Sequence, residues 1–209
     1  MTLRESSMGK LERASLLLLS GLLSAGIAAS AGPETRIERS QDAIRINASL
    51  RVDAHHHIAW QVLTDYNNLA RFVPGMQTSQ IVSRPGEALL LKQTGQSGFL
   101  LFALPIEVVV RITETPLEVI RFEAVGGSFK NKRGECRIKG QDDATLLVYQ
   151  ASIVPGFWVP PLLGPAVMGQ DGRSKLMGLA REMQRRAVTT VTAASVSVAQ
   201  RGCRIGQRT

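Results

Sequence analysis

Residues 155–187 read PGFWVPPLLGPAVMGQDGRSKLMGLAREMQRRA. Small and apolar residues recur in this stretch at spacings of three and four, a period that places them on one face of a helix. A glycine inside a helix costs about 1 kcal/mol relative to alanine, so glycines on that face predict a compensating gain from their surroundings. We interpret the segment as one long helix that lies across a sheet, packs closely at one end and leaves space at the other. The residues of the inward face are Leu162, Ala166, Gly169, Gly172, Leu176, Leu179, Ala180 and Met183.

The chain before this helix alternates apolar and polar residues, as half-buried strands do. Residues 43–53 predict a first strand, and two short helices follow it, the second over 69–72. The glycine-bounded stretch 95–105 is interpreted as a loop between two later strands. This order predicts an α+β fold, with a twisted antiparallel sheet of about seven strands wrapped around the long C-terminal helix. The six later strands are predicted at 76–83, 88–95, 106–115, 117–126, 129–139 and 145–154.

Strand alternation predicts which side chains face the helix, because successive residues of a strand point to opposite faces of the sheet. Phe122 and Ala124 share one face of their strand, Gly134 and Cys136 face inward from the next, and Tyr149 faces inward from the last. Small residues in the middle of the sheet therefore lie opposite the small residues of the helix. The pattern predicts a cavity between sheet and helix, and close packing without a cavity remains the alternative.

The two ends of the chain differ in composition from this body. Residues 1–31 resemble a secretory signal peptide, with a basic leader, an apolar run over 14–28 and small residues before position 32. An uncleaved membrane anchor is the alternative. We expect 32–42 to be a linker, 43–187 the folded domain, and 188–209 a flexible basic tail, because the last segment lacks a helical apolar stripe. Cleavage after residue 31 predicts a periplasmic or secreted protein.

The charge balance indicates the kind of surface the protein would meet. The chain has 209 residues, 44% of them hydrophobic, and a formal net charge of +8. That excess favours peripheral contact with an anionic membrane surface. No helix-turn-helix, zinc-finger or aromatic RNA-binding pattern accompanies the charge, so we expect no nucleic-acid partner.

Residues with catalytic or metal-binding potential give weak patterns. His55, His56 and His57 are all the histidines of the chain, and ligands at consecutive positions do not easily converge on one ion from a regular helix. The outward alternation of the glutamates and the apolar context of Cys136 give no acid-base pair and no activated nucleophile. We therefore expect no catalytic residue, metal or cofactor. Whether Cys136 pairs with Cys203 is left open.

Candidate ligand contacts come from aromatic residues at strand ends and from the small residues of both walls. Loop aromatics commonly rim an apolar pocket or touch a membrane. Arg133, beside Phe129, would suit a carboxylate or head group, although a solvated strand face is the alternative for it. The predicted ligand-binding set is Phe99, Phe102, Phe122, Ala124, Phe129, Arg133, Gly134, Tyr149, Trp158, Gly169 and Gly172.

Several segments are also familiar as motifs. Residues 60–66 read WQVLTDY, 71–75 read RFVPG, and 116–122 read PLEVIRF. With Trp158, Val159 and Pro160 before a long helix, they resemble the START-like (SRPBCC) superfamily, in particular its polyketide cyclase/dehydrase and coenzyme-Q-binding branch. The resemblance covers about residues 40–187. It implies a helix-grip fold, in which a sheet grips one long helix around an apolar cavity.

The same resemblance implies three functions, because members of the superfamily include lipid and quinone carriers, polyketide cyclases and ribosome-associated toxins. The first is an exported binder or carrier of an apolar small molecule, either a lipid or an isoprenoid quinone. The alternatives are a polyketide cyclase or dehydratase and a protein-interaction module. The predicted export and the absence of an inward acid-base pair favour the carrier, and therefore a protein without enzymatic activity.

Overall fold

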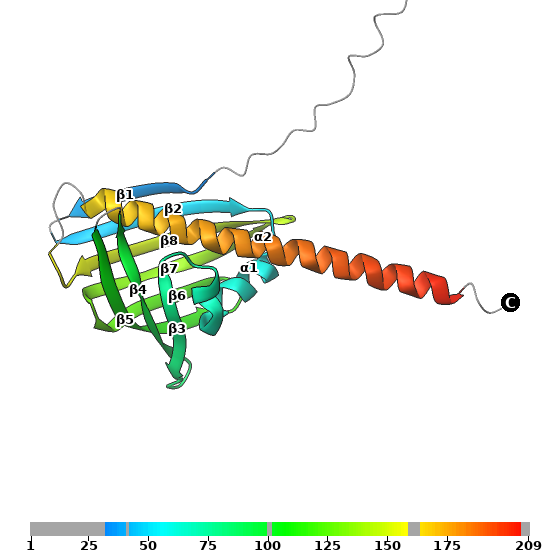
Figure 1. Ribbon diagram of the computed structural model, residues 1–209, viewed down its shortest axis with the longest axis horizontal. Helices are drawn as coiled ribbons and strands as arrows, with labels where there is room; N and C mark the ends of the chain where they lie inside the picture. Colours follow the sequence, from blue (N-terminus) through cyan, green and yellow to red (C-terminus); the bar gives the residue numbers. More distant parts are fainter. Residues whose placement is uncertain (1–31, 41, 100–101, 159–163, 206–209) are drawn as a thin grey trace, which may run out of the picture.

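The computed structural model describes residues 32–40, 42–99, 102–158 and 164–205, and it has the predicted α+β helix-grip architecture (Figure 1). The predicted signal peptide and Leu162 lie outside these ranges. The elements are β1 (Glu34–Ser40), β2 (Ala43–Val52), α1 (His56–Leu63), the 3-10 helix η1 (Tyr66–Arg71), β3 (Met76–Ser83), β4 (Leu89–Phe99), β5 (Phe102–Thr115), β6 (Val119–Gly127), β7 (Phe129–Gln141), β8 (Ala144–Pro155) and α2 (Gly164–Ile205).

The described strands form one antiparallel sheet of eight strands in the order β1-β2-β8-β7-β6-β5-β4-β3. The last strand, β8, pairs with β2, so strands from the beginning and the end of the domain are neighbours in the sheet. Figure 1 shows α2 lying across the sheet, with its C-terminal part extending beyond the strands. None of the described helices has the length and apolar character needed to span a membrane.

The predicted linker over 32–42 is wrong, because it contains β1. This strand pairs with β2 along its whole length, from Glu34 opposite Ser49 to Ser40 opposite Ala43. Its sequence, ETRIERS, is mostly polar and exposed, and it therefore lacks the apolar alternation that reveals a strand. Backbone hydrogen bonds to the edge of β2 make the strand, and these leave no signature in side-chain pattern. With β1 the described sheet has eight strands, one more than the seven that the sequence predicted.

The predicted loop over 95–105 is also wrong. β4 and β5 pair continuously from Leu89 opposite Ile112 to Phe99 opposite Phe102, so the segment is mostly a long hairpin. Its glycines suggested a loop, but Gly95 has a packing role within the strand. A Cβ at Gly95 would overlap the carbonyl oxygen of Gly75, because the turn before β3 passes directly over this point.

The expected flexible tail begins within a helix, since α2 continues to Ile205. Its polar residues fit a helix through their side chains: the hydroxyls of Thr189, Thr190 and Thr192 each donate to the carbonyl four residues earlier, at 2.9–3.0 Å. This part of α2 lies beyond the sheet, and Val188 is 67% exposed. An apolar stripe is therefore absent there without the helix being interrupted.

The core lies where the middle of α2 meets the sheet and α1. Leu176, Ala180 and Met183 are buried at the helical spacing that the sequence predicted, and Met183 is fully buried. They belong to one apolar cluster with residues of β2, α1, β7 and β8, among them Leu50, Val52, Ala59, Val62, Ile138 and Leu147. This packing confirms the predicted inward face of α2 from Leu176 to Met183, whereas Ala166, also predicted to face inward, is exposed.

Three contacts hold α2 against the residues at the two ends of η1. A Cβ at Gly178 would overlap the Phe72 carbonyl oxygen and the Pro74 ring, so the helix crosses these residues at backbone distance. Two turns later Arg186 forms an ion pair with Asp65 at 2.6 Å and lies 5.7 Å from the centre of the Phe72 ring. These contacts fix the path of the helix over the sheet.

We predict opposite effects for the same substitution at two glycines of α2. Gly178→Ala should lower the free energy of unfolding by about 1–3 kcal/mol, because the overlap is with rigid backbone and proline atoms. A Cβ at Gly172 would meet no atom within 4 Å, so Gly172→Ala should raise the free energy by about 0.5–1 kcal/mol through helix propensity alone. Urea unfolding of both variants measures the difference. Equal stabilisation by both would contradict the close crossing at Gly178.

Candidate functional site

A cavity of about 300 Å³ lies between the sheet and α2. This volume is at the lower end of the range typical of small-molecule sites. The wall of the cavity is chiefly apolar, and its residues come from α1, η1, α2 and most of the strands. Examples are Leu69 of η1, Leu91 of β4, Val110 of β5, Ile120 of β6, Ile153 of β8 and Leu179 of α2. The cavity confirms the predicted space between sheet and helix.

Four residues of the predicted ligand-binding set line this cavity: Phe122, Phe129, Tyr149 and Gly172. The rings of Phe122 and Tyr149 stack, with their centroids 5.8 Å apart and their planes 16° apart. Burial chiefly raises the pKa of the Tyr149 hydroxyl above its ordinary value, so this group stays neutral. These aromatic residues line the cavity from the sheet, and a Cβ at Gly172 on α2 would meet no atom within 4 Å.

Gly169 and Gly134 do not mark the cavity, contrary to the prediction. A Cβ at Gly169 would overlap Cδ1 of Ile37, and one at Gly134 would overlap the Gln150 carbonyl oxygen and lie 2.7 Å from Cζ of Phe122. Both glycines therefore accommodate neighbours that already occupy the space. For Gly169 that neighbour comes from β1, the strand that the sequence pattern did not reveal.

The remaining predicted contacts also lie elsewhere or cannot be placed. Arg133 and Trp158 are exposed, Trp158 to 78%, and neither is among the described residues of the cavity wall. Ala124 is partly buried against the cluster around η1 and β5 instead. Phe99 and Phe102 pair at the end of the β4–β5 hairpin, and their side chains lie outside the described part of the chain.

Sequence reasoning missed a lysine that faces the cavity. Lys132 lines the wall and is partly buried, with Nζ 5.9 Å from the centroid of the Phe122 ring and 5.3 Å from that of Phe129. Burial, and secondly the charge of Lys175, lower its pKa to about 8. The signal was present, because Lys132 shares the strand parity of the inward Gly134 and Cys136. Arg133, the residue predicted instead, has the opposite parity.

Two more charged groups enter the cavity wall from α2. Lys175 Nζ lies 2.6 Å from Asp171 Oδ2, one helical turn away, and both residues line the cavity. The sequence analysis found no inward acid, and Asp171 corrects it. With Lys132, the wall holds two ammonium groups and one carboxylate. Thr35 of β1 adds a buried hydroxyl oxygen with no hydrogen-bond partner among the described residues.

Cys136 fits its interpretation from the sequence, which was a residue in an apolar context without an activated thiol. Cys136 is a free, buried thiol, and burial raises its pKa to about 12, so it is not an activated nucleophile. The side chain of Cys203 lies outside the described part of the chain. The apolar setting of Cys136 makes it part of the cavity wall rather than a reactive group.

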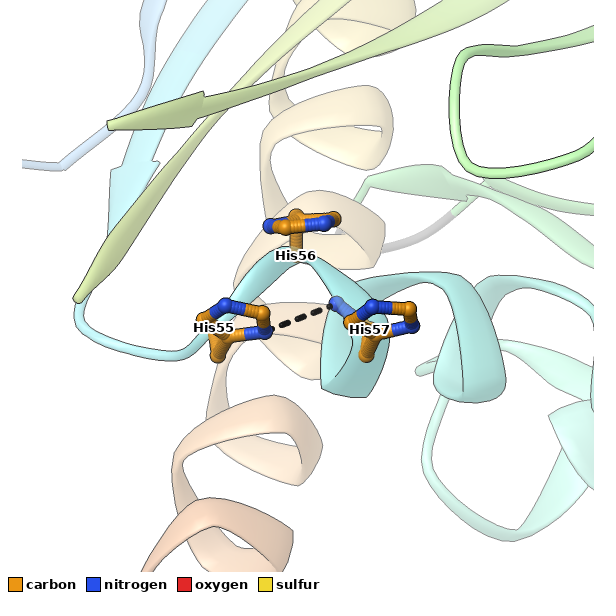
Figure 2. Close-up of side chains that lie close together, drawn as sticks. All are labelled: His55, His56 and His57. Atoms are coloured by element: carbon orange, nitrogen blue, oxygen red, sulfur yellow. Dashed lines mark hydrogen bonds between the residues drawn. The ribbon is translucent and has the colours of Figure 1, made fainter. Parts of the chain in front are cut away.

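His55, His56 and His57 form a cluster at the start of α1 (Figure 2). Their potential ligand atoms lie within 4.8 Å of one another, but the His55 and His57 rings are stacked 8° from parallel. Stacked rings direct their nitrogen lone pairs side by side rather than at one ion. The Nδ1 atom of His55 also accepts a hydrogen bond from the His57 amide at 3.4 Å. His55 therefore caps α1, and the absence of a metal role stays a prediction.

Comparison with known proteins gives the family. The sequence model of the family described as polyketide cyclase / dehydrase and lipid transport matches residues 52–180. The chain belongs to this family. The match begins at the end of β2 and ends within α2, so it includes most of the elements that form the cavity. It confirms the resemblance to the START-like superfamily. None of the curated proteins compared with the chain matches it.

Solved structures share the fold at low sequence identity. The Zhui aromatase/cyclase from Streptomyces sp. R1128 is 17% identical, with a TM-score of 0.59 over 69% of this chain and 95% of its own. A STAR-related lipid transfer protein from Xanthomonas axonopodis is 14% identical, with a TM-score of 0.56 over 74% and 99%. Human STARD10 is 11% identical, with a TM-score of 0.59 over 74% and 70%. At these identities the likeness shows the fold alone.

We predict that Gly169 serves packing against β1. Gly169→Leu should lower the free energy of unfolding by about 1–3 kcal/mol, because the larger side chain must displace Ile37. Ile37→Ala in the same chain should recover part of that loss, since it removes the atoms that clash. Chemical denaturation of the two single variants and the double variant gives the coupling energy. Strictly additive effects would show that the two residues do not share this space.

Proposed function

We propose that this protein binds an apolar small molecule, of the lipid or isoprenoid quinone class, in the cavity between the sheet and α2. The observation that carries the proposal is the chiefly apolar cavity of about 300 Å³ that lies between the helix and the sheet. Membership of a family described by lipid transport as well as by cyclisation supports it. So does the likeness to a protein named for lipid transfer.

The binding energy would come from burial of the ligand. Each methylene group moved from water into such a cavity contributes about 0.8 kcal/mol. Gly95 and Gln96 of the β4–β5 hairpin line the cavity on one side, and Met168, near the start of α2, lines it on another. We place the entrance between these two elements, since hairpin and helix can part without breaking the sheet.

A second function is favoured by one observation. Lys132 and Asp171 place an amine and a carboxyl group in the wall of the cavity, where the sequence analysis expected no acid-base pair. A cyclase or dehydratase acting on a polyketide-like substrate needs such groups for proton transfer. Turnover of a linear poly-β-ketone that is lost in Lys132→Met, while binding is kept, would establish this function. We rank it second because Asp171 is held by Lys175 at 2.6 Å.

We also propose that the protein is exported and works at a membrane surface. The signal-like pattern of residues 1–31 supports export, and β1 begins at Glu34, so cleavage after residue 31 would leave the described fold whole. The net charge of +8 supports contact with anionic lipid. N-terminal sequencing of the protein from its native cell tests export. A retained N-terminus in the cytosol would remove this part of the proposal and favour the protein-interaction alternative.

We predict that filling the open space at Gly172 blocks binding. Gly172→Leu should weaken binding of the neutral dye N-phenylnaphthylamine roughly tenfold, because the side chain would replace about two methylene groups of ligand. Gln170→Leu places the same side chain on the exposed face of α2 and should leave affinity unchanged. Fluorescence titration measures both.

Native mass spectrometry and organic extraction of the purified protein complete this test. Loss of affinity confined to Gly172→Leu, with a lipid recovered from the wild type, supports the proposal. A wild-type protein that binds no dye and yields no extractable lipid would overturn it.

A further inference from the structure

We propose that Lys132 forms a subsite for the carboxylate of the bound molecule, so that the ligand is an acidic amphiphile rather than a neutral lipid. This inference rests on the proposed function, since it names the ligand class of the same cavity. Lys132 projects from β7 into a wall that is otherwise chiefly apolar, and its ammonium group lies against two aromatic faces. A purely apolar ligand would offer this ammonium group no polar partner.

The charge balance of the wall favours an anion. Lys132 and Lys175 each contribute one positive charge, and Asp171 contributes one negative charge. Asp171 already lies 2.6 Å from Lys175. Lys132 is within ion-pair distance of no described acid, although the Asp171 charge partly offsets the repulsion from Lys175, and its closest described partners are the two ring faces. A cation among apolar side chains is costly unless an anion pairs with it. A ligand carboxylate would supply that partner.

The protonation behaviour of Lys132 gives the subsite a pH dependence. Its pKa is lowered to about 8, first by burial and then by Lys175. An ammonium-carboxylate contact needs the protonated amine, so affinity for an acidic ligand should fall as pH rises above about 8. The other titratable groups in the cavity wall are Asp171 and Lys175 of α2, Tyr149 of β8, Cys136 of β7 and Tyr66 of η1. Tyr149 and Cys136 have raised pKa values and stay neutral at this pH.

A lysine stem that merely covers aromatic surface while its ammonium reaches water is the competing explanation. In that case the ammonium has no ligand to select, and the affinity for acidic and neutral ligands of equal chain length would be the same. The two explanations therefore predict different ratios of affinity for acidic and neutral head groups. The affinity for a single ligand does not distinguish them.

The test compares dodecanoate with dodecanol, two probes with the same apolar chain and different heads. Isothermal titration of the full chain at pH 7 should show dodecanoate binding about tenfold to a hundredfold more tightly, the range for a charge-assisted hydrogen bond. Lys132→Met keeps a flexible side chain of similar length without the charge. It should remove the preference, so that dodecanoate binds no more tightly than dodecanol to the same variant.

Lys139→Met is the matched control, because Lys139 lies on the same strand with its side chain exposed and the variant loses the same charge. It should keep the full preference for dodecanoate. A second measurement uses the wild type alone: between pH 7 and about pH 9 the dodecanoate affinity should fall several-fold while that of dodecanol holds. This series keeps the inference testable even if Lys132→Met is poorly folded.

The outcomes distinguish the inference from the function on which it rests. Equal affinity for the two probes, or a preference that survives in Lys132→Met, would overturn the carboxylate subsite and leave the apolar binder intact. Failure of the wild type to bind either probe would overturn the proposed function itself. A preference lost equally in Lys139→Met would assign it to the overall charge of the protein and would also overturn the subsite.

Discussion

The approach of Gly178 to the turn at residues 72–74 fixes where α2 lies on the sheet. With no side chain at this point, the helix meets the Phe72 carbonyl and the Pro74 ring directly. The helical repeat then places Lys175 and Asp171 on the same face one and two turns earlier, where they line the cavity. One turn later it places Glu182 beside Arg186, which pairs with Asp65. The anchoring contacts and the polar part of the cavity are thus consequences of one crossing point.

Most of the fold could be predicted from sequence because its core follows local periodicity. The buried positions Leu176, Ala180 and Met183 repeat with the helical period, and the inward positions of β6 and β8 repeat with the strand period. β1 could not be predicted in this way, because its stability comes from backbone pairing with β2. The continuation of α2 to Ile205 was missed for a related reason: an exposed helix needs no apolar face.

The candidate site was less predictable, because a cavity depends on which residues meet across the molecule. Gly169 and Gly172 give the same sequence signal, yet Ile37 fills the space at the first and no atom lies near the second. Only knowledge of β1 separates them. The inward position of Lys132, in contrast, could have been predicted from the sequence, because Lys132 is two residues from Gly134 and therefore lies on the same face of the strand. A lysine on a strand is normally a surface residue, and this expectation concealed Lys132, the one charged residue that enters the cavity from the described part of the sheet.

The identity of the ligand decides what Lys132 does chemically. With a pKa of about 8, about a tenth of the amine is neutral at pH 7. A carboxylate beside it stabilises the ammonium form, raises the pKa and makes the group an anchor. A neutral polyketone would leave the pKa low, and the neutral amine could then accept a proton as a base. Anchoring and proton transfer by Lys132 therefore exclude each other for a given ligand. The two proposed functions, carrier and cyclase, would therefore be separated by the charge of the molecule that binds, although both would use the same cavity.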